Sequence, residues 1–232
     1  MRNPAETRER LLDTAIQLIW QSNYSNVGVN DICCRAGVTK GAFYHHFESK
    51  AELYCAASQH YWEGLKKELD ELYSPASGSL ELLENVIGFV TARQASLHAT
   101  SKEGPGQPAV VGCPFFTSGG QAGTDEEKVR LAAAEMSAKG VRYYAALARR
   151  LKEDGYLNGD PDPQQLGRLM QQFVQGLLMY ARVENSLAGV SLDLREGLYR
   201  LLDLKQAHRR APEATSVPAA TQPTATPAAS TS

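Results

Sequence analysis

The chain has 232 residues, a formal net charge of −2 and a charged fraction of 22%. This length allows one large domain or two smaller ones with a hydrophobic core. A near-neutral chain is not a polycation, so any contact with nucleic acid must come from a local patch. Its apolar runs fall far short of the roughly 20 residues that cross a bilayer, and residues 1–15 lack a signal-peptide core. We therefore expect a soluble, cytoplasmic protein without a membrane partner.

Helical periodicity runs through the chain, and no alternating β pattern appears. Polar or glycine- and proline-rich segments separate the periodic stretches, and the segment 109–122 is the least periodic. From residue 211 the tail is rich in Pro, Ala, Thr and Ser, without aromatic residues, which predicts disorder. The pattern predicts helices over residues 5–21, 29–35, 40–47 and 50–72, from 79 through 90, from 124 through 151, and over 163–185 and 191–204.

Residues 29–52 contain the signals of two short helices joined by a tight turn. Gly28 is suited to cap the first helix, with Asp31 in its first turn. Gly37 is suited to the left-handed conformation that ends that helix, and Thr39 to the cap of the next. Ser49 and Glu52 form a capping box that begins a long helix. This arrangement predicts a helix-turn-helix, with apolar packing from Ile32, Ala36, Val38, Phe43 and Phe47.

A helix-turn-helix places its second helix in the major groove of DNA and braces it with the first. The outer face of that second helix must carry hydrogen-bond donors, and small residues allow close approach to the bases. Lys50 begins the following helix, where a cation and free N–H groups can meet a phosphate. The candidates on the outer face are Thr39, Lys40, Gly41, Ala42, Tyr44 and His45.

The sequence AGVTKGAFYHHFESKAEL, residues 36–53, closely resembles the recognition motif of the TetR family of bacterial repressors. The resemblance is strong over about residues 7–57 and weak beyond. It implies an all-α protomer of about nine helices: a three-helix DNA-binding domain (1–50), a larger effector-binding and dimerisation domain (51–206) and a disordered tail (207–232). It also implies a homodimer on a palindromic, double-stranded DNA operator, associated with the bacterial nucleoid, and release by a small effector.

Position by position, the resemblance implies that Lys40, Gly41 and Ala42 read bases. Tyr44, His45 and Lys50 then grip the phosphate backbone with help from Thr39, and Asn30 lies where some members read a base. His46 and Phe47 match packing positions. The chain departs from the family at Asn23, Val27, Gly28 and Val29, which puts phosphate contacts at that helix start in doubt.

Two helices near the C-terminus, over 163–185 and 191–204, have broad apolar faces that suit a four-helix bundle with a second copy. Packing within one chain is the alternative, and the resemblance favours the dimer. The expected interface residues are Leu166, Met170, Phe173, Leu177, Leu194, Leu198 and Leu201.

An effector pocket is expected between the long helices of the second domain, with aromatic side chains that suit an apolar or planar ligand. Each candidate could equally belong to the core. The candidates are Trp62, Phe89, Arg93, Cys113, Phe115, Phe116, Tyr143, Tyr144, Phe173 and Tyr180.

The four cysteines show no C-x-x-C pair and no zinc-finger spacing, so no metal or cofactor is expected. Cys33, Cys34 and Cys55 are interpreted as reduced, buried thiols. Cys113, in the segment Val-Gly-Cys-Pro-Phe, is either a packing residue or a thiol sensor of oxidants and electrophiles, since some family members have a similar Gly-Cys pair. An enzyme is not expected, because no second cysteine, catalytic triad or phosphate loop accompanies it. The prediction is a ligand-responsive repressor, with the thiol sensor, or an activator or global regulator without a ligand, as alternatives.

Overall fold

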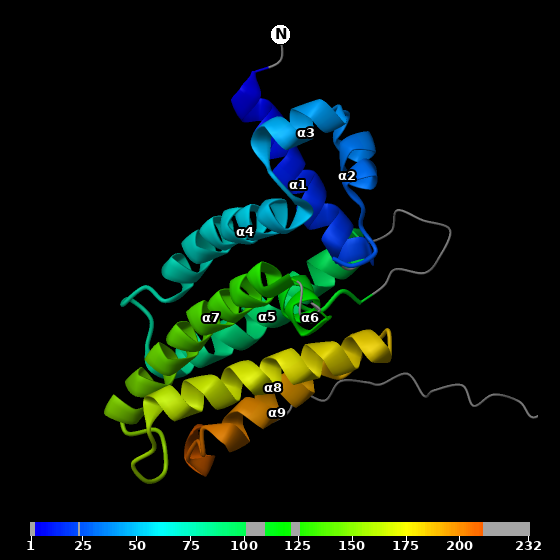
Figure 1. Cartoon of the computed structure of the whole chain (residues 1–232). Helices are drawn as coiled ribbons and strands as arrows, with labels where there is room; N and C mark the ends of the chain where they lie inside the picture. Colours follow the sequence, from blue (N-terminus) through cyan, green and yellow to red (C-terminus); the bar gives the residue numbers. More distant parts are fainter. Residues whose placement is uncertain (1–2, 23, 101–109, 122–125, 211–232) are drawn as a thin grey trace, which may run out of the picture.

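The computed structural model describes residues 3–22, 24–100, 110–121 and 126–210 of the chain. Within them the chain forms nine α-helices and, apart from one isolated bridge between Leu157 and Leu204, no β structure, which confirms the predicted all-α fold (Figure 1). The elements are α1 (Pro4–Ser22), α2 (Val29–Ala36), α3 (Lys40–His46), α4 (Lys50–Leu72), α5 (Ser79–Thr100), α6 (Pro114–Gln121), α7 (Glu127–Glu153), α8 (Pro163–Val183), α9 (Val190–Leu201) and a 3-10 helix, η2 (Gln206–His208).

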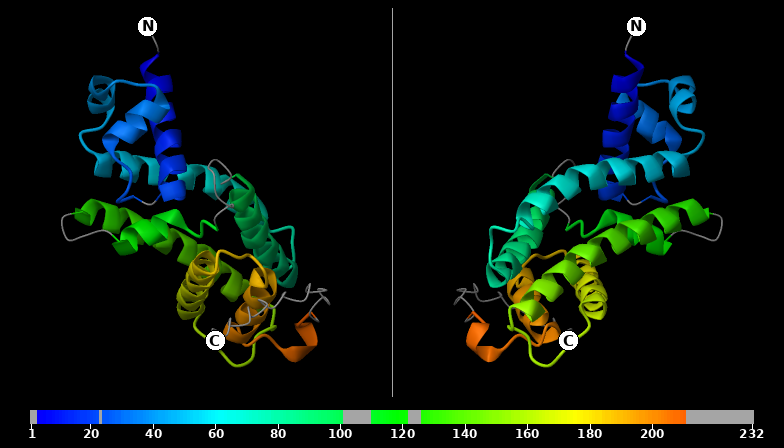
Figure 2. Two further views of the ribbon diagram at one scale, coloured as in Figure 1. Left: turned by 90° about the vertical axis from the view of Figure 1, so that its right-hand side faces the viewer. Right: turned by 90° about the vertical axis from the view of Figure 1, so that its left-hand side faces the viewer.

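The helices α1, α2 and α3 gather at one end of the molecule, and α4 leads from them toward the remaining helices (Figures 1 and 2). We call the described part of residues 3–57 the head and that of residues 58–210 the body. Apolar side chains at helical spacing on α1 pack against α2 and α4. Phe43 of α3 is fully buried among them. Truncating such a residue to alanine typically costs about 3–5 kcal/mol, so Phe43 is central to the stability of the head.

The start of α4 belongs to the head core. Ser49 accepts a hydrogen bond from the Glu52 amide at 3.1 Å, so the predicted cap forms. Leu53, Tyr54 and Ala57 are buried in the same cluster as the α1 and α2 side chains. The head core therefore continues past residue 50 into the start of α4.

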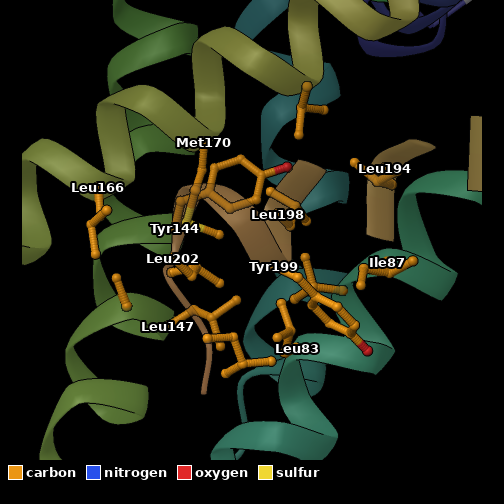
Figure 3. Packing of buried hydrophobic residues seen from close by; sticks show 14 of the residues in the cluster. Leu83, Ile87, Tyr144, Leu147, Leu166, Met170, Leu194, Leu198, Tyr199 and Leu202 are labelled. Atoms are coloured by element: carbon orange, nitrogen blue, oxygen red, sulfur yellow. The ribbon is translucent and has the colours of Figure 1, made fainter. Parts of the chain in front are cut away.

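The body core lies between α5, α7, α8 and α9 (Figure 3). The glycine at 167 allows α8 to approach α7 closely, since a Cβ there would lie 2.8 Å from the Ala145 Cβ. Glu84 of α5 is mostly buried and accepts a hydrogen bond from the Tyr199 hydroxyl of α9. Arg195 Nε lies 3.2 Å from the same carboxylate, so a largely buried acid joins α5 to α9.

The helix α6 lies in the segment that showed no clear periodicity. Pro114 begins it, a position that proline favours because its missing N–H has no partner there anyway. Phe115 is fully buried while Phe116 is exposed, and eight residues are too few to show a helical period. The helix α7 begins at Glu127 with Glu126 at its cap position, and residues 124 and 125, where the sequence predicted its start, lie outside the described residues. Residues 207–210 of the predicted tail are described and Arg210 approaches Glu84, whereas 211–232 lie outside the described residues.

Candidate functional site

The turn between α2 and α3 sets the angle of the two helices. Gly37 has φ 62° and ψ 41°, which is the left-handed region that glycine enters without strain. The Gly37 amide donates to the Cys34 carbonyl at 3.2 Å, and the Val38 amide donates to that of Cys33 at 3.0 Å. These bonds satisfy the last carbonyls of α2 and turn the chain into α3.

The exposed side of α3 carries the residues that the sequence singled out. Tyr44 is 56% exposed, and its ring meets the Phe43 ring edge-on at 5.1 Å. Thr39 accepts a hydrogen bond from the Ala42 amide at 3.1 Å and so caps the helix, as predicted. The structure exposes Asn30, Thr39, Lys40, Gly41, Tyr44 and His45, and half-buries Ala42.

Lys50 is held by the head itself. Its Nζ donates to the Tyr24 carbonyl at 3.1 Å and lies 4.0 Å from the centre of the Tyr24 ring. This contact holds the ammonium of the first residue of α4 against Tyr24. An ammonium has three N–H donors, so Lys50 retains donors for a phosphate.

Arg8 is a cation of this region that the sequence reading missed. It is exposed on α1, and its guanidinium lies 5.4 Å from the centre of the Phe47 ring. The pKa of neighbouring His46 is lowered by burial, by His45 and by Arg8. No local sequence signal joins residue 8 to residue 47, because only the tertiary structure brings α1 beside the segment that follows α3.

The body contains a partly open cavity of about 160 Å³ between α4, α5, α6, α7 and α8. Its walls are mainly apolar and aromatic, as ligand pockets are. The cavity brings together most of the predicted pocket residues: Trp62, Phe89, Arg93, Cys113, Phe115, Phe116, Tyr143 and Tyr144. Further lining residues that the sequence did not single out include Tyr61, Tyr73, Gln94, Met136, Gln171 and Gln175.

Two predicted pocket residues lie elsewhere. Phe173 points from α8 toward α9, since a Cβ on Gly197 would lie 2.0 Å from the end of its ring. Tyr180 is 65% exposed on α8. The side of α8 that faces the cavity carries Gln171, Val174 and Leu178. Phe173 and Tyr180 lie on other sides of the same helix, so they do not reach the cavity.

Cys113 directly precedes α6 and lines the cavity. Burial raises the pKa of its thiol, although backbone N–H groups of Phe116 and Phe115 and the charge of Arg93 oppose the shift. The other cysteines differ from expectation in one respect: Cys33 is buried and Cys55 half-buried, but Cys34 is exposed. Cys34 follows Cys33 on a short helix, so the two point in different directions.

The cavity and the head share α6. Phe115 lines the cavity and also packs in the head core with Tyr54. The Tyr54 hydroxyl donates to the Phe115 carbonyl at 3.2 Å in a buried position. A second connection runs from the Tyr24 hydroxyl to Glu126, at the start of α7, over 3.1 Å. These two hydrogen bonds join α6 and the start of α7 to the head.

Comparison with known proteins identifies the family. Residues 11–57, which contain the helix-turn-helix described above, match the family model of the bacterial regulatory proteins of the tetR family. The chain is a TetR-family transcriptional regulator. Its helix-turn-helix is a DNA-binding element. The proteins to which it is similar are named as transcriptional regulators and not as enzymes.

Similarity to the relatives of this TetR-family chain extends beyond the head. An uncharacterized HTH-type transcriptional regulator of Mycobacterium tuberculosis is 27% identical over 82% of this chain and 91% of its own length. The repressor NemR of Escherichia coli is 34% identical over 32% of this chain and 37% of its own length. Among solved structures, a TetR-family regulator from Agrobacterium tumefaciens has a TM-score of 0.72 at 23% identity, over 85% of this chain and 98% of that chain.

The TetR-family chain was also expected to expose a dimer face, but several of the predicted residues are internal. Leu166, Met170, Leu194 and Leu198 lie in the core of the single chain (Figure 3). They pack against α5 and α7, so they cannot contact a second copy. Phe173, Leu177 and Leu201 are only partly buried.

A different stripe of α8 is exposed. Leu169 is 38%, Tyr180 65% and Val183 74% exposed. Together with Phe173 and Gly176 they recur every four or three residues, which is the spacing of a helix–helix seam. We call Leu169, Phe173, Gly176, Tyr180 and Val183 the α8 stripe. The sequence pattern contained this stripe, but the stronger apolar face of α8 concealed it.

The described residues offer neither a membrane-spanning helix nor a cluster of metal ligands. No helix described in the TetR-family chain is long and apolar enough to cross a membrane. Within the described ranges, no three side chains of His, Cys, Asp or Glu converge in the way that a metal site requires.

Proposed function

We propose that this TetR-family regulator is a repressor that binds a palindromic operator as a homodimer and releases it when a small molecule occupies the cavity. The observation that carries the proposal is the position of α6. This helix forms part of the cavity wall through Phe115 and part of the head core through the same residue. A ligand that shifts α6 would move the head, and a ligand that prefers one arrangement shifts the population toward it.

The α8 stripe supports the homodimer. A symmetric pair of α8 helices would bury Tyr180 and Val183, which water now contacts, and burying each large apolar side chain contributes roughly 1.5–3 kcal/mol. A two-fold dimer would present two α3 helices to successive major grooves, whose centres are roughly 34–36 Å apart. The tilt of the two heads then determines whether both fit the operator at once.

Removing donors from the head should weaken operator binding. In gel-shift titrations with the DNA beside its own gene, Lys50→Ala is expected to weaken binding and to lower the salt slope by about 1, because one phosphate contact is lost. Tyr44→Ala should weaken binding further without changing thermal stability, because its side chain is largely exposed. Lys66→Ala, an exposed lysine on α4 paired with Asp70, is the matched control. Unchanged affinity in both head variants would refute the assignment of the DNA face.

A second candidate function is a thiol sensor based on Cys113. The observation that favours it is the position of this thiol in the cavity wall, where a bound molecule would contact it. One structural relative, NemR of Escherichia coli, was crystallised in a reduced form and has a TM-score of 0.66 at 20% identity, over 82% of this chain and 94% of that chain. Against a sensor, burial raises the pKa of Cys113 and so disfavours the reactive thiolate.

Alkylation separates the two candidates. Iodoacetamide at neutral pH is expected to modify exposed Cys34 well before Cys113, because only the thiolate reacts and burial raises the pKa of Cys113. Peptide mass spectrometry over time gives both rates. Cys113→Ser should retain operator binding and release by ligand. Rapid alkylation of Cys113, and a response to diamide that Cys113→Ser loses, would instead establish the sensor.

The direction of regulation has its own test. A promoter–reporter fusion is expected to rise in expression when the gene is deleted, as repression requires. A fall on deletion would identify an activator, and a change that no small molecule reverses would identify a regulator without a ligand.

A further inference from the structure

The cavity has the size of a small planar molecule. Its volume is about 160 Å³, and an apolar protein cavity of about 150 Å³ can hold one benzene ring. Ring faces and edges of Trp62, Phe89 and Tyr143 contribute to its wall. Such walls favour a flat, apolar body, since aromatic rings pack best against other rings in offset or edge-on geometry.

One end of the cavity is polar. Arg93 of α5 donates from Nε and Nη2 to the Tyr61 hydroxyl, at 3.1 and 2.9 Å. It donates from Nη1 to Glu68 at 2.8 Å. These contacts use one N–H of each guanidinium nitrogen, and each Nη atom carries a second N–H. Arg93 therefore retains donors for a further acceptor.

Tyr61 adds a donor beside the guanidinium. Its oxygen accepts both bonds from Arg93, and within the described part of the chain its own proton has no acceptor. Burial raises the pKa of the Tyr61 phenol, although Arg93 opposes the shift, so the hydroxyl keeps its proton. The pair presents N–H and O–H donors from one place.

The positive charge of Arg93, at the polar end of the cavity, meets no negative charge inside the cavity. Arg93 is the one charged side chain among the described residues of the wall. Its partner Glu68 is half-exposed, does not line the cavity, and is screened by water. A carboxylate held inside the cavity would meet Arg93 in a less polar medium, where charge-assisted hydrogen bonds are stronger.

We propose that the cavity binds a single-ring aromatic carboxylate, with its ring among the aromatic walls and its carboxylate on Arg93 and Tyr61. The proposal names the effector class of the cavity and so rests on the proposed function. An amine is not suited to this site, because no described acidic side chain lines it. A neutral ring of the same shape fits the walls but leaves the guanidinium without an anion.

The polar end also contacts the head. The Tyr61 ring lies 5.6 Å from the Trp20 ring of α1 and 5.0 Å from the Phe115 ring of α6, measured between centres. A carboxylate that draws the Tyr61 hydroxyl toward itself would change both contacts. Recognition of the acid and displacement of the head would then begin at the same side chain.

Benzoate and benzamide are the probes, because they share one shape and differ in charge. Titration of the full chain by isothermal calorimetry is expected to show benzoate binding at least about tenfold more tightly than benzamide. Arg93→Met should abolish that preference while benzamide still binds, which shows that the cavity persists. Tyr61→Phe should reduce the preference about threefold or more, and Arg130→Met, an exposed arginine paired with Glu127, should leave it unchanged.

Equal affinity for both probes in the wild type, a preference that survives Arg93→Met, or the absence of binding by either probe would overturn the proposal. Operator binding, followed by fluorescence anisotropy, is measured separately. If benzoate binds through Arg93 and the operator stays bound, the carboxylate site is supported, but the proposal that an effector in this cavity releases the operator is refuted. If another molecule releases the operator and benzoate does not bind, the carboxylate proposal fails and the proposed function stands.

Discussion

A chain carrying Tyr180→Asp and Val183→Asp is expected to be monomeric and to lose at least about a hundredfold in operator affinity. Both side chains are mostly exposed in the single chain, so the substitutions remove no internal packing. In the dimer proposed here they would bury two carboxylates per copy without partners, which is strongly unfavourable. Light scattering after gel filtration measures the mass, and anisotropy measures the affinity.

Leu131→Asp is the matched control for the dimer experiment. Leu131 is 52% exposed on α7, outside the α8 stripe, so this variant places a carboxylate at another exposed apolar position. It should remain a dimer and bind the operator normally. A Tyr180 and Val183 double variant that stays dimeric would show that another surface holds the two copies together.

Replacement of Gly41 by leucine is expected to change stability and DNA binding in opposite directions. A Cβ at this position meets only Thr39 Oγ1, at 3.8 Å, so the free protein has room for the side chain. Because leucine favours a helix more than glycine does, the free energy of unfolding should stay the same or rise by up to about 1 kcal/mol. On DNA the new side chain would occupy the space of close approach to the bases, and affinity should fall at least about tenfold.

The control for Gly41 is Gly64→Leu on α4. A Cβ on Gly64 would have no atom within 4 Å, and this residue lies outside the head. Both variants should match or exceed the wild type in thermal stability, and only Gly41→Leu should lose operator affinity. Equal operator binding by the two would show that the start of α3 does not approach the bases.

The head was predictable because its signals are local. Gly37 needs the left-handed conformation within its own turn, and Thr39 and Ser49 cap helices within three residues of themselves. The side chains on the outer face of α3 follow from helix geometry alone. Lys50 was identified as a cation at a helix start, but its contact with Tyr24 was not, because residues 25–49 separate them along the chain.

The sequence predicted the helices of the body, but not which side of each helix faces the core, the cavity or the solvent. The apolar stripe of α8 containing Leu166 and Met170 is the stronger one, and the sequence alone could not say that α5 and α7 cover it. The same ambiguity placed Phe173 in the pocket, where helix rotation excludes it. The helix α6 escaped notice because it is short and contains two adjacent glycines, which are poor helix formers.

Sequence by itself determined the all-α fold, the helix-turn-helix and the residues on the outer face of α3, since each depends on spacing within a few turns of one helix. Tertiary structure decided which apolar stripe of α8 remains exposed, that Arg93 and Tyr61 meet at one end of the cavity, and that Phe115 belongs to both cavity and head. Those features depend on how helices distant in the chain rotate and pack against one another, and a helical period specifies which residues share a face without specifying what that face will meet.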